Sequence, residues 1–426
     1  MRKLKAAVIG AGSTYTPELI EGFIDRRQSL DFQTIYLMDI NREKLEVTGG
    51  LAKRMLLSKG FGGKIVLTGG LDETITGADY IFAQIRAGGM AARIRDEKIP
   101  LKHGLLGQET TGAGGFMNAL RTVPVMLDIA RRVEKLAPDA WLVNFSNPSG
   151  IIAEAILNHT KIKMIGLCNC FINMKADIAK SIGTEDFDYD YVGLNHLSWI
   201  TSVRLGGKEL ISELVKASGA KMKNIPGMDY DDELIQSLPG IPSSYLSYYY
   251  LRDRQLEKCL NAEKTRGEIC LELEKSLMEQ YKNPLLDEKP KELAERGGAL
   301  YSTAAVSVVD AIENDRNEYH VVNVKNSGAI PFMEDDDVVE TRCLVNRKGA
   351  EPVKVSEFDS PFIKGLMQVV KAYEKLTVKA AIDGNRADAL AALMVHPLIG
   401  DYNKALAVLD EMIKANAKYL PAGLLK

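Results

Sequence analysis

The chain has 426 residues, 46% of them hydrophobic and 26% charged, and its formal net charge at pH 7 is -3. This composition is typical of a globular protein, and the length predicts two domains or one enlarged domain. The near-balance of acids and bases argues against nucleic acid or an anionic membrane as partner, and no apolar run is long enough to span a bilayer. Five scattered cysteines and an N-terminus that leads straight into a strand, without a signal peptide, predict a cytoplasmic protein.

The first predicted strand ends in a glycine turn. An apolar run at residues 6–9 predicts a buried strand that Gly10 and Gly12 interrupt, and a helix begins near Thr16 with a hydroxyl cap and a proline in its first turn. In this arrangement backbone N–H groups can approach a pyrophosphate. Tyr15 occupies the place of the usual third glycine, so a plain strand–helix corner is the alternative.

Asp39 strengthens the prediction of a dinucleotide site. It ends the second predicted strand, where an acid binds the 2′-hydroxyl of the adenosine ribose of NAD. An acid there also repels the 2′-phosphate of NADP, although Arg42 lies three residues further on. We therefore predict NAD as the cofactor, bound by Gly10, Gly12, Ser13, Thr14 and Asp39.

The first 170 residues alternate between predicted strands and helices. Such alternation implies a parallel sheet covered on both faces, and six strands match the doubly wound dinucleotide-binding fold. Ligands of these sheets bind at the carboxyl ends of the strands, so the residues that follow each strand are the informative ones. The predicted strands are 6–9, 34–39, 64–69, 79–85, 140–145 and 163–168, and the predicted helices are 17–28, 42–59, 71–76, 115–136 and 148–159.

Two polar segments follow the fourth strand. The first carries Arg86, Arg93 and Arg95 around a glycine pair, and the planar guanidinium group suits a phosphate or carboxylate on a substrate. The alternative for each arginine is a solvated helix face. The second segment, 107–115, is rich in glycine and holds a single acid, Glu109, for which a turn-capping role is favoured on the sequence alone.

Polar residues also follow the fifth and sixth strands. Asn147 precedes a proline, which keeps its backbone out of the helical region and can direct its amide into the cleft, with a helix cap as the alternative. Cys168 follows the sixth strand, and His196 comes 28 residues later. Cysteine and histidine can bind a transition metal, but two ligands make half a site, and water or substrate must supply the others. On spacing alone, a buried cysteine and a satisfied histidine are favoured.

From about residue 197 the pattern becomes mixed and predicts a second domain. We expect residues 1–195 to form the NAD-binding domain and residues 196–426 an α+β domain for catalysis, substrate binding and oligomerisation. The predicted elements of the second part are a hairpin at 201–210, little regular structure over 209–238, a tyrosine-rich helix at 242–250, a helix at 269–281, strands at 320–325 and 338–344, and an antiparallel helical pair over 361–415 broken at 383–385.

Several short motifs occur in one order along the chain. They are Gly-Ala-Gly-Ser-Thr at 10–14, Gly-Gln-Glu-Thr-Thr-Gly at 107–112, Asn-Phe-Ser-Asn-Pro at 144–148, Cys-Asn at 168–169, Asn-His-Leu-Ser-Trp at 195–199, Ser-Tyr-Leu-Ser-Tyr-Tyr at 244–249 and Thr-Arg at 265–266. As an ordered set they resemble glycoside hydrolase family 4, the NAD- and metal-dependent glycosidases, which are an exception to the two-carboxylate mechanism. The Cys-Asn and Asn-His-Leu-Ser-Trp motifs look like the 6-phospho-β-glucosidase branch, although Phe171 stands where the family pattern has proline, which leaves the local loop shape and the aglycone preference open.

The resemblance implies an architecture shared with lactate and malate dehydrogenases and a mechanism that begins with oxidation. NAD⁺ oxidises C3 of the sugar, a base removes the C2 proton, the C1 substituent leaves, water adds and the hydride returns. The implied roles are Tyr245 as the base, Glu109 and Asn169 as further catalytic residues, Arg93, Asn147 and Arg266 as substrate-binding residues, and Cys168 and His196 as ligands of Mn²⁺ or another divalent cation.

The predicted function is hydrolysis of 6-phospho-β-glucosides, with a phosphorylated disaccharide such as 6-phospho-cellobiose or an aryl glucoside phosphate as substrate and a homodimer or homotetramer as the assembly. A 6-phospho-α-glucosidase or another glycosidase of the family is the first alternative. A 2-hydroxyacid dehydrogenase would need a His–Asp pair with matching arginines, and a redox-sensing regulator would need an appended binding module. The sequence favours neither.

Overall fold

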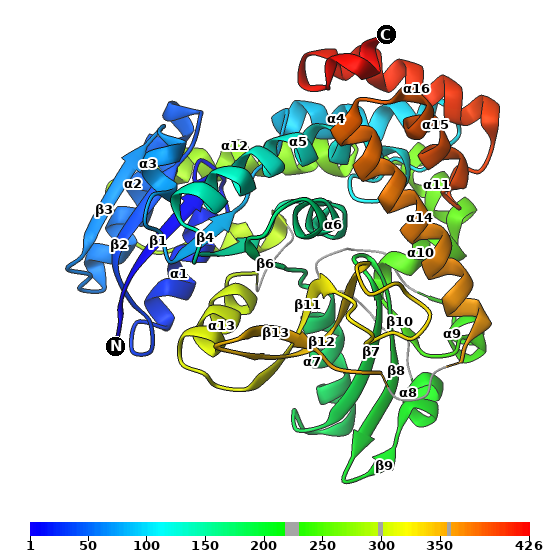
Figure 1. Ribbon diagram of the computed structural model, residues 1–426, viewed down its shortest axis with the longest axis horizontal. Helices are drawn as coiled ribbons and strands as arrows, with labels where there is room; N and C mark the ends of the chain where they lie inside the picture. The colour runs from blue at the N-terminus through cyan, green and yellow to red at the C-terminus, as the bar shows by residue number, and fades with distance from the viewer. Residues whose placement is uncertain (218–229, 297–300, 356–358) are drawn as a thin grey trace.

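Nine strands form one sheet in the part of the chain that the structure describes, residues 1–217, 230–296, 301–355 and 359–426 (Figure 1). In this computed structural model the strand order is β13-β12-β11-β6-β5-β4-β1-β2-β3. Strands β1 to β6 are parallel and have the doubly wound order, which confirms the predicted α/β class. Their bounds are β1 (Lys3–Ile9), β2 (Asp31–Met38), β3 (Lys64–Thr68), β4 (Tyr80–Ala83), β5 (Trp141–Asn144) and β6 (Lys163–Gly166).

The central parallel strands are buried on both faces, as their apolar runs predict. Successive residues of a strand point to opposite faces, so Ala6 and Val8 of β1 belong to one hydrophobic core and Ala7 and Ile9 to another. The first core includes residues of α1 (Thr16–Asp25), α2 (Arg42–Ser58) and α13 (Tyr301–Glu313), and the second includes residues of α5 (Gly112–Leu136), α6 (Ser149–His159) and α14 (Pro361–Asp383).

The five helices predicted for the first half are present to within three residues at either end, α3 (Leu71–Ile75) included. Two further helices lie where none was predicted, α4 (Gly89–Lys102) and α7 (Cys170–Ile182). The buried face of α4 mixes apolar residues with Arg93, Asp96 and Glu97, which are held in ion pairs and hydrogen bonds, so it lacks a clear apolar period. Helix α7 does bury an apolar stripe against the second sheet, which includes Met174 and Ile178.

A smaller antiparallel sheet follows the sixth parallel strand. It contains β7 (Asp188–Leu194), β8 (Leu197–Leu205), β9 (Lys208–Glu209) and β10 (Ile241–Pro242). The predicted hairpin at 201–210 is confirmed, because β8 pairs with β9 and the chain turns at Gly206 and Gly207, both with positive φ.

The prediction of little regular structure over 209–238 is wrong at both ends of that stretch. Helices α8 (Ile211–Ala217) and α9 (Asp232–Ser237) form there, and residues 218–229 lie outside the described residues. Helix α8 is stabilised by tertiary packing, because Ile211, Leu214 and Val215 contact the hydrophobic core beneath the small sheet.

The tyrosine-rich segment is shorter as a helix than predicted, with a 3-10 turn η1 (Ser244–Leu246) leading into α10 (Ser247–Tyr250). Helix α12 (Arg266–Tyr281) begins three residues earlier than predicted, because Thr265 and Glu268 form a capping box at its first turn. Between and after them lie α11 (Arg252–Asn261) and η2 (Lys291–Arg296).

The C-terminal part returns to the large sheet. Strand β11 (Glu318–Lys325) pairs antiparallel with β6 and with β12 (Val338–Asn346), and β13 (Gly349–Pro352) completes that edge. The large sheet therefore contains strands from both sides of residue 195, and the division into two domains at that residue stays a prediction.

The predicted helical pair over 361–415 consists of three helices. Helix α14 ends at Gly384, in the left-handed region, and α15 (Arg386–Val395) is separated from α16 (Tyr402–Asn416) by Pro397 and Gly400. The 3-10 turns η3 (Ala417–Tyr419) and η4 (Ala422–Leu425) end the chain.

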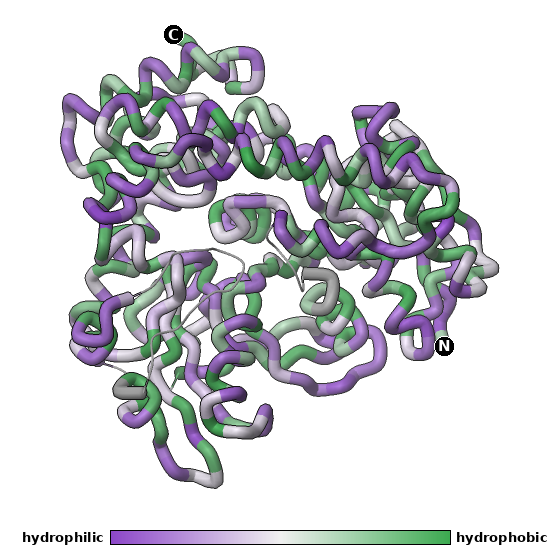
Figure 2. Tube along the Cα trace, turned by 180° about the vertical axis from the view of Figure 1, so that it is seen from behind, coloured by the Kyte–Doolittle hydropathy of each residue, from purple (hydrophilic) through white to green (hydrophobic). Residues whose placement is uncertain are grey.

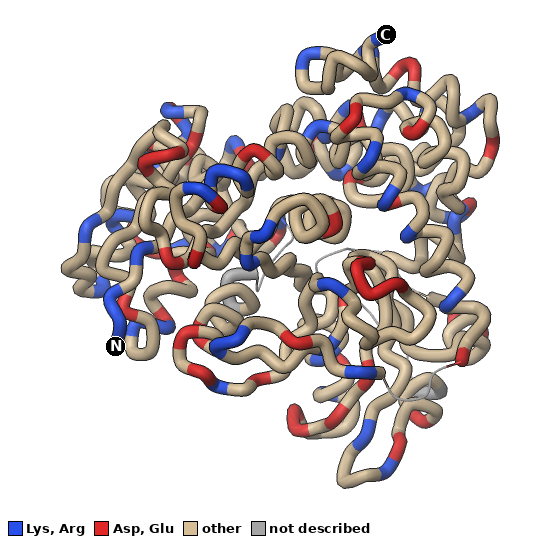
Figure 3. The backbone as a smooth tube through the Cα atoms, viewed as in Figure 1, with Lys and Arg blue, Asp and Glu red and all other residues tan. Residues whose placement is uncertain are grey.

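Hydropathy and charge vary along the chain as in other globular proteins. Hydrophobic segments gather in the strands and along one side of the helices, with hydrophilic segments at many of the outer loops (Figure 2). Basic and acidic residues are interspersed along the trace in both halves (Figure 3). Within the described ranges, no helix has both the length and the apolar content needed to cross a membrane.

Candidate active site

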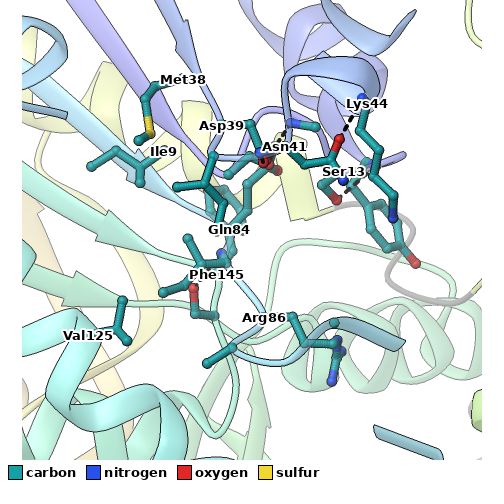
Figure 4. A pocket seen from close by; sticks show the side chains of 18 of the residues that line it. Ile9, Ser13, Met38, Asp39, Asn41, Lys44, Gln84, Arg86, Val125 and Phe145 are labelled. Atoms are coloured by element: carbon teal, nitrogen blue, oxygen red, sulfur yellow. Dashed lines mark hydrogen bonds between the residues drawn. The ribbon is translucent and has the colours of Figure 1, made fainter. Parts of the chain in front are cut away.

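A cavity of about 650 Å³ opens at the carboxyl ends of β1, β2, β4 and β5. Strands β1 and β4 are neighbours from which the chain proceeds to opposite edges of the sheet, and doubly wound sheets bind ligands at that crevice. We call this space the cofactor cavity. Figure 4 shows Asp39, Asn41 and Lys44 at one end, Arg86 at the other, and Gln84 between them.

Gly10 and Gly12 shape the turn that borders the cofactor cavity. Gly10 has φ of 88°, and a Cβ there would lie 2.7 Å from the carbonyl oxygen of Gln84. A Cβ on Gly12 would lie 2.8 Å from Oδ2 of Asp39. A side chain at either position would collide with its neighbour, so the backbone needs glycine at both. Both glycines line the cavity, as the sequence predicts for a cofactor-binding turn.

Asp39 also lines the cavity, and its carboxylate is held by the turn itself. It accepts backbone hydrogen bonds from Gly12 and from Asn41, each at 2.8 Å. A carboxylate offers about four lone-pair sites, so these two bonds leave capacity for a ribose hydroxyl. Arg42 is 89% exposed and pairs with Glu46 at 3.5 Å.

Ser13 and Thr14, the other predicted cofactor-binding residues, lie differently. Ser13 lines the cavity, and its hydroxyl accepts a hydrogen bond from the Tyr15 backbone at 3.3 Å. Thr14 is buried, and its carbonyl accepts a hydrogen bond from the Tyr281 hydroxyl at 2.8 Å. The turn is therefore anchored to α12 through Thr14 while Ser13 faces the cavity.

The second half of the chain supplies part of the cavity wall. Glu274 of α12 forms ion pairs with Lys44 and, at 3.2 Å, with Arg296. The guanidinium carbon of Arg296 lies 4.7 Å from the centre of the Tyr15 ring. All four of these residues line the cavity.

Glu109 lies between two arginines. Its carboxylate pairs with Arg86 at 2.5 Å and with Arg93 at 3.0 Å, and Arg93 also pairs with Glu97 at 2.9 Å. Burial alone would raise the pKa of Glu109, but Arg86 and Arg93 outweigh burial and lower that pKa to about 2. At neutral pH Glu109 is therefore an anion held in ion pairs, not the turn cap that the sequence alone favours.

Cys168, His196 and Tyr245 come together, and we call them the Cys–His–Tyr cluster. The rings of His196 and Tyr245 stack with centroids 3.8 Å apart and 11° between their planes, and Tyr245 packs against Cys168. A side-chain hydrogen bond with Cys170 and burial raise the pKa of Cys168, whereas the neighbouring His196 lowers it. His196 also contributes to lowering the pKa of Glu109, so the cluster adjoins the arginine pair that leads to the cofactor cavity.

The backbone at His196 is unusual. This residue lies in the turn between β7 and β8 and has φ of 63°, in the left-handed region. Glu340 of β12 supports the turn on both sides. It accepts hydrogen bonds from the Asn195 amide at 2.9 Å and from the Tyr191 hydroxyl at 2.7 Å, and that hydroxyl lies 2.6 Å from the Ser198 hydroxyl.

The Cys–His–Tyr cluster fits a divalent cation held by two protein ligands. Nδ1 of His196 is buried and has no hydrogen-bond partner among the described residues, a state that a metal bond would satisfy. Within the same residues, no group of three or more His, Cys, Asp or Glu side chains could hold an ion. Cys168 and His196 would therefore be joined by oxygen ligands from substrate or water.

The predicted substrate-binding residues lie around the same region. Asn147 lines the cofactor cavity, and its carbonyl accepts a hydrogen bond from Asn118 at 3.1 Å. Arg266 is the first residue of α12 and donates to the Glu295 carbonyl at 2.8 Å. The next residue along, Gly267, donates its N–H to Glu97 at 2.6 Å, which brings the start of α12 beside the Arg93–Glu97 pair.

Asn169 and Phe171 flank the start of α7. Asn169 is buried at the N-cap position, and its carbonyl accepts a hydrogen bond from the Asn173 side chain at 2.9 Å. Phe171 packs against Tyr189 and Tyr191, with ring centroids 4.7 and 5.1 Å apart. The residue that replaces the expected proline is therefore a core residue between α7 and the small sheet.

Sequence reasoning missed several residues of the site. Glu274 and Glu340 lie in a helix and a strand whose patterns gave no hint of a ligand, and only tertiary packing brings them to the site. Arg296 did carry a signal. It precedes a glycine pair, as does the segment that contains Arg86, and that similarity is visible in the sequence.

The chain is similar to known proteins over almost its whole length. The model "Family 4 glycosyl hydrolase" matches residues 5–184, and its C-terminal domain model matches residues 191–399. A probable 6-phospho-beta-glucosidase of Bacillus subtilis is 40% identical, over 98% of this chain and 97% of that protein. A phospho-alpha-glucosidase of Clostridium acetobutylicum is 31% identical, over 98% of this chain and 99% of that protein.

Solved structures show the same architecture. The 6-phospho-beta glucosidase of Thermotoga maritima, solved with manganese, NAD+ and glucose-6-phosphate, has a TM-score of 0.89 and 34% identity, and the match covers 98% of this chain and 99% of that one. The malate dehydrogenase of Plasmodium falciparum, at a TM-score of 0.52, 16% identity and coverage of 89% and 99%, shares the fold alone. Since the two family models match successive parts of the sequence and full-length relatives reach 40% identity, this chain belongs to family 4 of the glycosyl hydrolases.

Proposed function

We propose that this protein hydrolyses 6-phospho-β-glucosides, with NAD and a divalent cation such as Mn²⁺ as cofactors. The observation that carries the proposal is the stacking of Tyr245 on His196, at 3.8 Å and beside Cys168, which brings a candidate base against both candidate metal ligands. The β preference is supported by identity, which is 40% to the Bacillus subtilis β-enzyme and 31% to the Clostridium acetobutylicum α-enzyme.

When bound, NAD⁺ accepts and returns the hydride at C3 of the sugar, and the cation polarises the oxygens at C2 and C3. The chain supplies the rest. Oxidation at C3 makes the C2 proton acidic, and Tyr245 is the group we assign to remove it. The departing C1 substituent takes its electron pair from the broken C–O bond, and water then adds at C1, so the overall reaction is hydrolysis.

Arginines and amides orient the sugar phosphate in this proposal. Arg93 of α4 and Arg266 at the start of α12 both lie near enough to Tyr15 to affect its pKa, and Asn147 lines the adjoining cavity. Two guanidinium groups near one point suit a phosphate monoester. Glu109 is ionised between Arg86 and Arg93, so its role is to hold those arginines beside the Cys–His–Tyr cluster. Asn169, at the N-cap of α7 next to Cys168, is assigned to the catalytic set by its place in the sequence motif.

The test uses the exchange of the C2 proton. With Mn²⁺, NAD⁺ and a reductant, p-nitrophenyl-β-glucoside-6-phosphate hydrolysed in D₂O should leave deuterium at C2 of the released sugar phosphate. Tyr245→Phe removes only the hydroxyl, and we expect turnover to fall by at least about 100-fold, the low end of general-base contributions. Tyr248→Phe is the matched control, since that ring lies 6.2 Å from Tyr245 and its hydroxyl interacts with Gln108.

The outcomes separate the assignments. Absence of deuterium at C2 of the sugar phosphate released by the wild type would contradict the redox-elimination mechanism. Full activity in Tyr245→Phe would remove Tyr245 as the base and leave the mechanism standing. Faster turnover of maltose-6′-phosphate than of 6-phospho-cellobiose would reassign the protein to the α-acting enzymes.

Location and assembly belong to the same proposal. All five cysteines are free thiols, and a phosphorylated sugar is an intracellular substrate, so we infer a cytoplasmic enzyme. We also infer a homodimer or homotetramer, because Phe362 and Val369 of α14 and Met394 of α15 are exposed large apolar side chains. Sedimentation velocity at micromolar concentration tests this, and a single species with the mass of one chain would contradict it.

A further inference from the structure

Arg296 stands out among the residues that line the cofactor cavity. It is the last residue of η2, and its side chain is 10% exposed. One face of its guanidinium group lies against the Tyr15 ring, 4.7 Å from the ring centre. Its Nη2 donates to Oε2 of Glu274 at 3.2 Å. The group is thus held in a fixed orientation by an aromatic ring and one carboxylate.

The guanidinium group has hydrogen-bonding capacity left over. Nε and Nη1 are buried and have no hydrogen-bond partner among the described residues. Arginine cannot lose its proton, and a buried cation with unused donors is costly unless an anion completes its bonds. Arg296 is therefore a cation with incomplete hydrogen bonding in the wall of the cavity, where an anionic ligand would stabilise it.

The local charge points to an anion. Glu274 is shared by two cations, since it pairs with Lys44 as well as with Arg296. One carboxylate between two cations leaves a net positive charge at this wall of the cavity. Arg93 and Arg266 lie near enough that they, together with Arg296, lower the pKa of Tyr15 against the larger opposing effect of burial.

Helix α12 explains how these groups form one surface. Arg266, Cys270 and Glu274 are spaced by four residues, so they share one face of the helix. The carbonyl of Arg296 accepts a hydrogen bond from the Cys270 thiol at 3.8 Å, and its guanidinium group bonds Glu274. The short helix η2 is therefore fastened along α12, and it carries Arg296 toward the glycine turn.

From this geometry we propose that Arg296 is a phosphate-binding residue, whose guanidinium group binds a phosphate group in the cofactor cavity that it lines. The inference rests on the proposed function, in which two phosphate-bearing molecules occupy the site, the dinucleotide and the sugar 6-phosphate. The chemistry is the same for both, because a planar guanidinium group forms charge-assisted hydrogen bonds with phosphate oxygens.

The experiment measures binding rather than turnover. Isothermal titration calorimetry gives the dissociation constant of NAD⁺ and, at saturating NAD⁺ and Mn²⁺, that of glucose-6-phosphate. We expect Arg296→Gln to weaken one of the two by roughly 10- to 100-fold, the range for hydrogen bonds to a charged group. Loss confined to NAD⁺ identifies the pyrophosphate, and loss confined to glucose-6-phosphate identifies the sugar phosphate. Arg296→Lys keeps the positive charge but loses the planar guanidinium group, so it should recover only part of the affinity.

Lys291→Gln is the matched control, because it removes the same charge from an exposed position of the same short helix. It should leave both dissociation constants unchanged. Wild-type affinity for both ligands in Arg296→Gln would overturn the proposal and leave the proposed function intact. A fall in melting temperature with equal weakening of glucose and glucose-6-phosphate would show a structural role and also overturn it. A wild-type protein that binds neither ligand would overturn both proposals together.

Discussion

His196 has a left-handed backbone, which costs a residue with a side chain on the order of 1–3 kcal/mol and persists only where the surroundings enforce it. Here the surroundings are polar. Glu340 receives hydrogen bonds from Asn195 and Tyr191, and Tyr191 reaches Ser198 on the far side of the turn. Among the described residues, Glu340 forms no ion pair with a lysine, arginine or histidine, and burial raises its pKa, so a cation at the nearby cluster would favour its charged form.

We expect Glu340→Gln to weaken Mn²⁺ binding by about tenfold, because one of the two acceptor oxygens becomes a donor facing other donors. Electron paramagnetic resonance of free Mn²⁺ measures the affinity directly. The dissociation constant of NAD⁺ should not change. Glu318→Gln, at the start of β11, is the control with the same chemical change. Unchanged Mn²⁺ affinity in Glu340→Gln would show that the His196 turn holds its shape without this carboxylate.

Cys168→Ser tests the other candidate ligand. A hydroxyl is a much poorer metal ligand than a thiolate, so we expect at least about tenfold weaker Mn²⁺ binding and slower turnover in a protein that stays folded. Cys343→Ser is the matched control, since Cys343 is buried in β12 and bonds a backbone carbonyl. If Cys168→Ser regains full activity after chelation and Mn²⁺ readdition, Cys168 is not a ligand.

At the scale of residues, the sequence predicted the site residues whose contacts lie near them along the chain. Gly10, Gly12 and Asp39 interact within 30 positions of one another, and their spacing revealed them. Arg296 contacts Tyr15 and Glu340 contacts Asn195, each more than 100 positions away, so spacing along the chain reveals neither contact, although a glycine pair does follow Arg296. The roles of Glu109 and Asn169 stay predictions that rest on the family resemblance.

Helices α6 and α14 meet β12 at a buried group of charges. Lys371 pairs with Glu154 at 2.8 Å and with Glu374 at 2.5 Å, so two carboxylates share one cation. Glu154 has additional donors, including the Val338 backbone N–H at 2.8 Å. Burial outweighs Lys371 at Glu374 and raises the pKa of Glu374 to about 7.

A raised carboxyl pKa makes the stability of the folded state change with pH in a defined direction. Between the unfolded value of 4.5 and about 7, the folded state binds more protons at Glu374 than the unfolded state does, so this group lowers stability as pH rises through that window. We expect Glu374→Gln to stabilise the protein at pH 8 by on the order of 2 kcal/mol and to have little effect at pH 4.5, since one unit of pKa is worth about 1.4 kcal/mol.

Urea denaturation at pH 4.5, 6 and 8 measures this difference. Glu154→Gln is the comparison, because that carboxylate has several donors and its loss should destabilise the protein at every pH. An unfolding free energy of Glu374→Gln that follows the wild type at all three values would mean that Lys371 keeps Glu374 ionised.

At the scale of elements, periodicity predicted α5, α6 and α14, which bury apolar stripes, but it missed α7, which also buries one. Helix α4 was missed because its buried face includes Arg93, Asp96 and Glu97, whose partners lie on other elements. Helices α8 and α9 were missed because the segment is polar on average, although Leu214 and Ile235 are buried. Helices α4, α8 and α9 were therefore missed because contacts with other elements, rather than local hydrophobicity, stabilise them.

The two halves of the molecule are joined by more than a linker. Strand β11 pairs with β6, and α13 packs on α1. Ion pairs across the halves include Arg26 with Asp310 and Lys289 with Glu18, both at 2.6 Å. The parallel order of β1 to β6 was predictable from sequence, but the return of the chain to that sheet was not, because antiparallel pairing with an edge strand leaves no local signal.

We expect a fragment of residues 1–195 to lose NAD⁺ binding and the cooperative unfolding of the full chain. Removal of residues 196–426 would expose the edge of β6 and the apolar surface that α13 covers. Circular dichroism and calorimetric titration with NAD⁺ on the purified fragment check this. A fragment that binds NAD⁺ as tightly as the full chain would show that residues 1–195 fold independently.

Helix α12 also connects the binding of NAD⁺ with the binding of the sugar phosphate. Its first residue, Arg266, is assigned to the sugar phosphate in the proposed function, and Glu274, about 12 Å further along the axis, lines the cofactor cavity. A helix is stiff over this length, so an occupant that fixes one end reduces the freedom left at the other. Thermodynamic linkage makes this reciprocal: whatever factor NAD⁺ adds to the affinity for the sugar phosphate, the sugar phosphate adds to the affinity for NAD⁺. If that factor is greater than one, the protein retains its dinucleotide most firmly while substrate is abundant and releases it as substrate runs out.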